Sequence, residues 1–354
     1  MSPDRELTAV PASAPKNRWS EYTQLSRQVK QAGLLDRRRG WYAARIGINL
    51  GLLAGGWAAF AILGESWWQL LTAAYLAVVF TQIAFVGHDA GHRQIFRSRR
   101  ANDRVGLVHA NLLVGVSFDW WVGKHNRHHS NPNHEDLDPD ISITALAFTA
   151  DQASSKHGLV RLIARHQAWL FFPLLLLEAA HLHLASAKAI LGGRGRANTV
   201  EGLLLVAHLA AYLAALALVL SPLQALAFVV VQQGLFGLYL GCSFAPNHKG
   251  MPTLTEADQL DFVRRQVLTS RNVAGSRPVD WLLGGLNYQI EHHLFPNMPR
   301  PNLRRAQPLI RAFCQQHGLP YTEASLVGSY AEAVRHLHSV GAPLRPGVAA
   351  ADQT

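Results

Sequence analysis

The chain has 354 residues, of which 49% are hydrophobic and only 16% are charged, and its formal net charge is +10. So low a charged fraction argues against an ordinary soluble protein, and the basic balance favours a negatively charged neighbour. The basic residues cluster beside apolar runs, which favours a membrane surface and argues against nucleic acid as the partner. The two cysteines, Cys242 and Cys314, form no CxxC motif and exclude a disulfide framework.

In chain order, the first 40 residues are polar and predict a cytoplasmic segment, partly disordered, with no secretory signal. Two pairs of uncharged or nearly uncharged apolar runs follow further along, at 46–63 with 67–87 and at 200–220 with 223–243. Each run reaches the length of about 17 to 25 residues that a helix needs to cross a bilayer. The short turns inside each pair, "GES" and "SP", predict two helical hairpins.

Arginines and lysines flank these hairpins on one side only. They precede the first run (37–45), follow the second (93–104), precede the third and follow the fourth, and neither hairpin turn has any. The positive-inside rule therefore predicts that both termini and the loop 88–199 face the cytoplasm.

Two further apolar stretches are harder to assign. The stretch Val105–Phe118 is too short to span easily, and Gln167–Ala187 contains Glu178, His181 and His183. A lone crossing at the second stretch would move everything after it to the other side, so we expect it to lie along the interface or beneath the cytoplasmic part. The sequence thus predicts an all-α membrane protein with four transmembrane helices in two hairpins and a cytoplasmic helical cap.

The 18 histidines include three compact groups at the predicted cytoplasmic ends of the spans. "HDAGH" (88–92), "HNRHH" (125–129) and "QIEHH" (289–293) have spacings of three or four residues, which place their side chains on one face of a helix. Imidazoles without partners so close to a bilayer would be costly, and metal binding removes that cost. We therefore predict metal ligands in eight histidines: His88, His92, His125, His128, His129, His248, His292 and His293.

Eight imidazoles exceed the set of about four that one ion takes, so two ions are indicated. The ligand type alone leaves zinc, copper, iron and nickel open. Three neighbouring side chains are candidates to support the ligands: Gln289, Asn247 and Asp89. Asn247 is also a candidate ligand or partner of a metal-bound water, and Gln289 a candidate weak ligand. The acidic stretch "NHEDLDPDI" (133–141) predicts a turn with basic partners, and His109, His181, His183 and His208 predict packed, hydrogen-bonded side chains.

At these residues the chain resembles the membrane fatty acid desaturase family, over about residues 40–310. The details "HDAGHRQIF", "NHKGMP" and "QIEHHLFPNMPR" are most similar to bacterial, particularly actinobacterial, acyl-CoA or acyl-lipid desaturases. A glutamine at the start of the third box also occurs in front-end desaturases, many of which carry a fused cytochrome b5 domain. We expect no such domain here, because no HPGG haem motif is present.

The resemblance implies a desaturase domain at 41–310, followed by a cytoplasmic helical region and tail at 311–354, in a bacterial plasma membrane. It implies two non-haem iron ions on the eight histidines, O2 as co-substrate, and a cis double bond formed in an acyl chain carried by CoA or a membrane lipid. It implies no catalytic side chain beyond the metal centre. The two electrons are expected from a separate ferredoxin or flavoprotein reductase, since no flavin or nicotinamide motif is visible. The alternatives are a lipid or carotenoid hydroxylase or ketolase on the same scaffold and, more distantly, a haem-binding membrane electron carrier.

Overall fold

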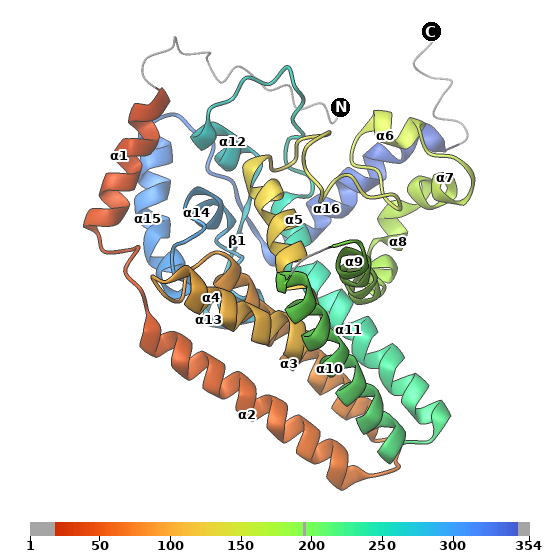
Figure 1. Ribbon diagram of the computed structural model, residues 1–354. Helices are drawn as coiled ribbons and strands as arrows, with labels where there is room; N and C mark the ends of the chain where they lie inside the picture. Colours follow the sequence, from red (N-terminus) through yellow and green to blue (C-terminus); the bar gives the residue numbers. More distant parts are fainter. Residues whose placement is uncertain (1–17, 194–195, 346–354) are drawn as a thin grey trace.

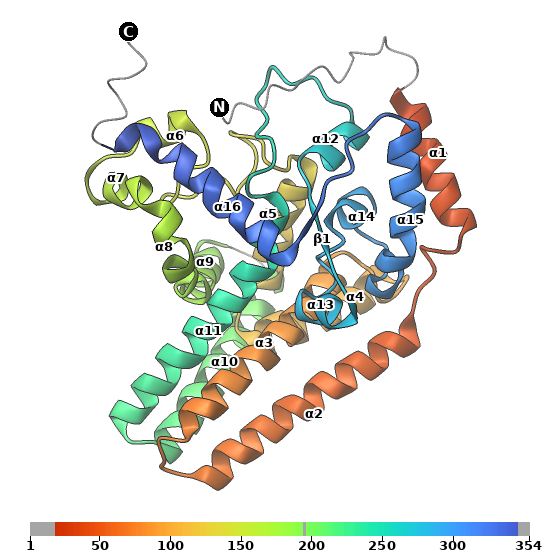
Figure 2. The ribbon, with the colours of Figure 1, turned by 180° about the vertical axis from the view of Figure 1, so that it is seen from behind.

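The computed structural model describes residues 18–193 and 196–345 (Figure 1). Four long helices form its lower half, and the shorter helices gather at one end of them (Figures 1 and 2). The four are α2 (Arg39–Leu63), α3 (Gln69–Gly91), α10 (Arg196–Val219) and α11 (Pro222–His248). Each is long and apolar enough to cross a membrane.

These helices confirm that the four predicted apolar runs are helical, within two residues at the hairpin turns, and each helix continues beyond its run at the end away from the turn. The two hairpin turns are as short as predicted: Gly64 follows α2 with φ +58°, and Pro222 begins α11 at a position where its missing N–H is harmless. The extensions matter more, because α3 runs on past residue 87 and α11 past residue 243. His88 and His248 therefore lie in the last turns of long helices.

Helix α3 is the most enclosed of the four. In an apolar segment of 18 residues, 67% of the residues of α3 are buried, against 17% in the corresponding segment of α2 and 11% in that of α10. It packs between α2 and α11. One apolar cluster joins Phe80 and Ile83 of α3 to Ala179 of α9 and Phe236 of α11. The exposed apolar faces of α2 and α10 are those that a surrounding bilayer would cover.

The two ambiguous stretches are both interrupted. Helices α8 (Gln167–Leu175) and α9 (Glu178–Gly192) meet at an angle of 67°, so 167–187 forms no single straight crossing. The π-helix η1 (Leu107–Val114) ends at Gly115, whose φ of +82° turns the chain by 111° into α5 (Phe118–Ser130). Counting each bent pair as one crossing would raise the number of candidate spans among the described residues to six.

The remaining elements lie at the upper end of the long helices (Figure 1). The all-α prediction holds except for one small parallel sheet, in which Asn272 pairs with Glu323. The predicted disorder near the N-terminus concerns in part residues 1–17, which lie outside the described residues, whereas α1 begins at Arg18. The other elements are α1 (Arg18–Gln31), α4 (Arg99–Gly106), α6 (Ala150–Ser154), α7 (Gly158–Arg165), α12 (Phe262–Leu268), β1 (Asn272–Ala274), α13 (Arg277–Leu282), α14 (Gln289–Leu294), α15 (Arg300–Gln316), β2 (Glu323–Ser325), α16 (Leu326–Val340) and η2 (Ala342–Leu344).

Candidate metal centre

Three histidine-bearing helices, α3, α5 and α14, meet where α3 ends. We name as the four-histidine group His88 and His92 from the end of α3, His125 from α5 and His292 from α14. One nitrogen from each of these imidazoles lies within 4.8 Å of the others. Helix geometry explains the local part, since residues four apart on α3 share one face. The rest is tertiary, because α5 and α14 bring in the other two rings.

A second set of imidazoles lies beside the first. We name it the three-histidine group: His128 from α5, His248 from the last turn of α11 and His293 from α14. The ring centroid of His248 lies 4.7 Å from those of His128 and His293. In "HNRHH", His125 therefore belongs to the four-histidine group and His128 to the three-histidine group. In "QIEHH", the adjacent His292 and His293 are divided between the two groups in the same way.

His129 lies between the two groups. Its Nε2 is 3.1 Å from Nε2 of His125, and its ring stacks on that of His293 with centroids 4.2 Å apart. It also meets the ring of His292 at 4.7 Å. All eight histidines singled out from the sequence therefore lie in one cluster.

The nitrogen atoms of this cluster fit metal ions. Burial lowers the pKa of five of these imidazoles well below the ordinary value, which keeps them neutral, the form that binds metal: His92, His125, His129, His292 and His293. For His128 the nearby carboxylates of Asp140 and Asp138 outweigh burial and raise the pKa. Buried polar atoms normally have partners, and ions between these rings would supply them. Within the described part of the chain, the buried nitrogens of the cluster that lack a hydrogen bond are His88 Nε2, His92 Nε2, His129 Nδ1, both of His292, and His293 Nε2.

In the three-histidine group every Nδ1 has a hydrogen-bond partner. Nδ1 of His128 lies 3.0 Å from both carboxylate oxygens of Asp138, that of His248 lies 2.9 Å from the carbonyl oxygen of Thr269, and that of His293 lies 2.8 Å from Gln266 Oε1. Such bonds fix the tautomer and the ring orientation of metal-binding histidines.

Sequence reasoning missed Asp138 and Gln266. The acidic stretch does have the predicted basic partners, since Lys124 and Lys249 both bond to Asp140. Asp138, however, is fully buried and holds His128. In the sequence, only its position ten residues after His128 pointed to this contact, and a spacing of ten residues is weak evidence that two side chains meet.

Asp89 occupies a supporting position in the four-histidine group. Its Oδ1 lies 3.2 Å from His88 Nδ1, while Oδ2 pairs with Arg300 at 2.6 Å and accepts from the Tyr42 hydroxyl at 3.1 Å. The carboxylate therefore joins the end of α3 to α2 and α15.

Gln289 and Asn247 lie together at the three-histidine group. Gln289 Nε2 is 2.8 Å from His248 Nε2, the nitrogen that faces the other rings, and Gln289 Oε1 accepts from Asn247 Nδ2 at 3.2 Å. Asn247 contacts no ligand histidine through a hydrogen bond in the described residues, and its buried Oδ1 has no partner there. Gln289 is thus placed where a fourth histidine of this group would be.

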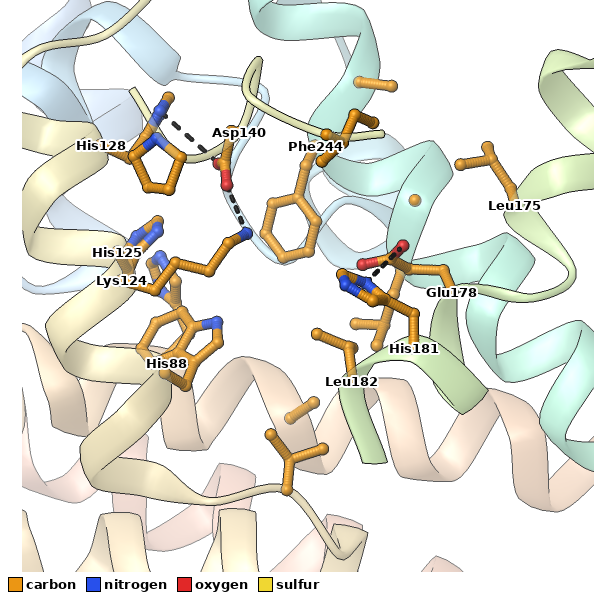
Figure 3. Close-up of a pocket in the computed structure, with 18 of the residues that line it drawn as sticks. His88, Lys124, His125, His128, Asp140, Leu175, Glu178, His181, Leu182 and Phe244 are labelled. Carbon is orange, nitrogen blue, oxygen red and sulfur yellow. Dashed lines mark hydrogen bonds and ion pairs between the residues drawn. The ribbon is translucent and has the colours of Figure 1, made fainter. Parts of the chain in front are cut away.

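A cavity of about 650 Å3 borders the histidines (Figure 3). Its wall is mostly apolar, with residues from α3, α5, α8, α9 and α11, and His88, His125, His128 and His248 at one side. Lys124 and Asp140 form an ion pair in the wall, and Glu178 and His181 form another across from it. His181 was expected to be packed; it is exposed at 53% because the break between α8 and α9 turns it toward this space. His109, His183 and His208 are hydrogen-bonded to backbone carbonyls, as predicted.

Known proteins similar to this chain share one enzyme family. The model of the family described as "Fatty acid desaturase" matches residues 65–325, which include all three histidine boxes. The chain is 32% identical to an acyl-lipid (9-3)-desaturase of Physcomitrium patens, over 77% of the chain and 53% of that protein, so it spans about half the length of this relative. It is 27% identical to a Δ(8)-fatty-acid desaturase of Helianthus annuus and 28% identical to the Δ(6)-fatty-acid desaturase fat-3 of Caenorhabditis elegans, over 92% and 94% of the chain and 74% and 77% of those proteins. These relatives are from plants and an animal, so the expected similarity to bacterial enzymes stays a prediction. The chain belongs to the fatty acid desaturase family of oxidoreductases.

Proposed function

We propose that the chain is an O2-dependent acyl desaturase that binds two iron ions, one at each histidine group, and forms a cis double bond in a fatty acyl chain. The observation that carries this proposal is the position of the two groups. They lie next to each other at the side of a mostly apolar cavity, and several of their buried nitrogen atoms have no hydrogen-bond partner among the residues that the structure describes. A cavity of about 650 Å3 is within the usual range for small-molecule sites.

Iron with O2 supplies the oxidising power that removes two hydrogen atoms from neighbouring methylene groups. The balance requires two electrons and two protons besides O2, and yields two water molecules. The protein's own residues position one pair of carbons beside the histidines and exclude water from it. Phe236, Leu240 and Phe244 of α11 give the cavity an apolar wall for this purpose.

The polar wall of the cavity is suited to the polar end of the substrate. Lys124 pairs with Asp140, and Lys249 Nζ donates to the Asp140 carbonyl at 3.1 Å while lying 4.1 Å from the Phe148 ring. Both ammonium groups retain further donors for an acyl ester or thioester. Either CoA or a membrane lipid can present such a group.

The chain holds no flavin or nicotinamide motif, so we infer that a separate ferredoxin or flavoprotein reductase donates the electrons. The lysines and arginines at the histidine end of the long helices support a cytoplasmic site for this donor. Turnover by the purified protein with NADPH alone would contradict the need for a partner.

The function is tested by expressing the chain in a host that lacks desaturases and locating the new double bond by mass spectrometry. Desaturation removes two hydrogen atoms from the acyl chain, whereas a hydroxylase or ketolase adds oxygen. Iron analysis of the purified protein should find two non-haem irons per chain. Oxygenated products, or stoichiometric haem with a strong Soret band, would overturn the proposal.

A further inference from the structure

The start of α5 is held by side chains from three other helices. The backbone N–H of Ser117 donates to Ser186 Oγ of α9 at 2.9 Å, and that of Phe118 donates to Asn111 Oδ1 of η1 at 3.1 Å. The N–H of Asp119 donates to Glu201 Oε1 of α10 at 2.9 Å. The first amides of a helix have no partner within it; these three are satisfied by other elements, and the N–H of Trp120 donates to the Ser117 hydroxyl oxygen at 3.3 Å.

Glu201 contributes most to this arrangement. Its other carboxylate oxygen accepts a hydrogen bond from the Ser117 hydroxyl, and the residue is only 3% exposed. It stands near the start of α10, an otherwise strongly apolar helix in which a carboxylate is costly. A negative charge at the start of a helix is stabilised by the free N–H groups and the helix dipole, so the start of α5 compensates for that cost.

Helix α5 is the element on which both histidine groups depend. It supplies His125 to the four-histidine group and His128 to the three-histidine group, with His129 between them. The helix follows the turn at Gly115, where the chain bends by 111°, so its direction is not continued from η1. His125 lies six residues after Asp119, about 9 Å along a rigid helix, so a displacement of its start reaches both groups.

We propose that Glu201 is a positioning residue: by binding the start of α5 it fixes the distance and angle at which His125 and His128 reach the two metal ions. This inference rests on the proposed iron-dependent function. A displacement of about 1 Å at a reacting centre lowers rates by up to about 100-fold, so the effect of losing Glu201 should be large although it contacts no ligand.

The test compares Glu201→Leu with Glu201→Gln and with the control Asn198→Ala. Leucine suits an apolar helix but leaves the Asp119 N–H and the Ser117 hydroxyl without an acceptor, whereas glutamine keeps an acceptor oxygen. Asn198 lies one turn earlier on α10 and donates to the Ile190 carbonyl of α9 at 2.7 Å, with no bond to α5. Its variant therefore removes a comparable helix–helix hydrogen bond from the same end of α10.

The measurements are iron retained against a chelator, the spectroscopic signature of the bound iron, kcat and KM for the acyl substrate, and the thermal midpoint. We expect Glu201→Leu to lower kcat at least about tenfold and to alter the iron signature, with KM changed less than about threefold. Glu201→Gln should recover most of kcat, and Asn198→Ala should keep wild-type kcat and iron. Equal iron retention and kcat in Glu201→Leu and Asn198→Ala would overturn the proposal, as would losses in both that follow the thermal midpoint.

If Glu201→Leu does not fold, Glu201→Asp takes its place, because it keeps the charge but shortens the side chain by one methylene and draws the carboxylate back from the Ser117 hydroxyl and the Asp119 N–H, while the N-cap bond of Ser117 to Trp120 stays intact. Lower kcat and iron retention than in Asn198→Ala support the positioning role, and wild-type values refute it. A wild-type protein without iron or desaturase activity would instead refute the proposed function, so the two failures are distinguishable.

Discussion

The two histidine groups differ in how their rings are held. In the three-histidine group each Nδ1 is bonded, to Asp138, Thr269 or Gln266. In the four-histidine group only His88 has an Nδ1 bond in the described residues, to Asp89. The rings there rely on packing, such as the stacking of His125 on Trp121 with centroids 4.5 Å apart.

This difference accompanies the substitution of histidine by glutamine in the third box. The four-histidine group has enough imidazoles for an ion by itself. The three-histidine group has one fewer, and Gln289 occupies the remaining side, next to His248 Nε2. The group that is poorer in ligands has the more complete set of outer hydrogen bonds. We infer that these bonds compensate for the missing imidazole by holding the remaining three in place.

The largest losses of iron and activity should come from single variants that remove one imidazole, either from the three-histidine group or from the four-histidine group. His128→Ala leaves two imidazoles in the three-histidine group, so we expect loss of one iron per chain and more than about 100-fold loss of activity, with the long helices still inserted in the membrane. His92→Ala leaves three imidazoles in the other group, so part of its iron should be retained. For each variant, the iron content per chain and the yield of desaturated product are measured.

The exposed His157 provides the control for this pair, since His157→Ala removes an imidazole that belongs to neither histidine group. Unchanged iron in His128→Ala would remove His128 from the ligands. Identical losses in His128→Ala and His92→Ala would show that the groups do not differ in ligand number.

A smaller effect should follow from changing the outer carboxylates. Asp138→Asn replaces a group that lies 3.0 Å from His128 Nδ1 through both oxygens, and we expect it to weaken iron retention by about 10-fold to 100-fold. Asp89 bonds a ligand histidine through one oxygen only, at 3.2 Å, in a group with four imidazoles. Asp89→Asn also removes the ion pair with Arg300, but it should weaken iron retention less than Asp138→Asn. Chelator competition on the purified proteins measures both. A larger effect of Asp89→Asn would contradict the compensation argument.

The sequence predicted the histidines of this centre better than the side chains that hydrogen-bond to them. The boxes are local patterns, and the apolar runs with their flanking arginines indicated that all of them lie at one end of the helices. Asp138 and Gln266 could not be assigned because their partners lie in other elements. Neither the π-helix at Leu107–Val114 nor the turn at Gly115 was recognised, although a glycine there was a hint.

Glu201 is a residue whose role could in part be expected from the sequence. It is a lone carboxylate inside the third apolar run, and such a residue usually has a specific partner. That partner, the start of α5, lies more than 80 residues earlier in the chain. Only the fold reveals it.

The smallest effect, and the one that decides the role of Gln289, concerns two glutamines on the same group. Gln266 bonds to Nδ1 of His293, the outer side of the ring, whereas Gln289 faces Nε2 of His248, the side toward the ion site. If Gln289 only supports His248, Gln289→Ala should lower iron retention by about the same two- to tenfold as Gln266→Ala, and far less than His293→Ala. A ligand role would instead bring Gln289→Ala close to His293→Ala, because the ion would then lose a direct bond. An amide is a poorer ligand than an imidazole, so we expect the first result; chelator titration of the three variants side by side distinguishes the two.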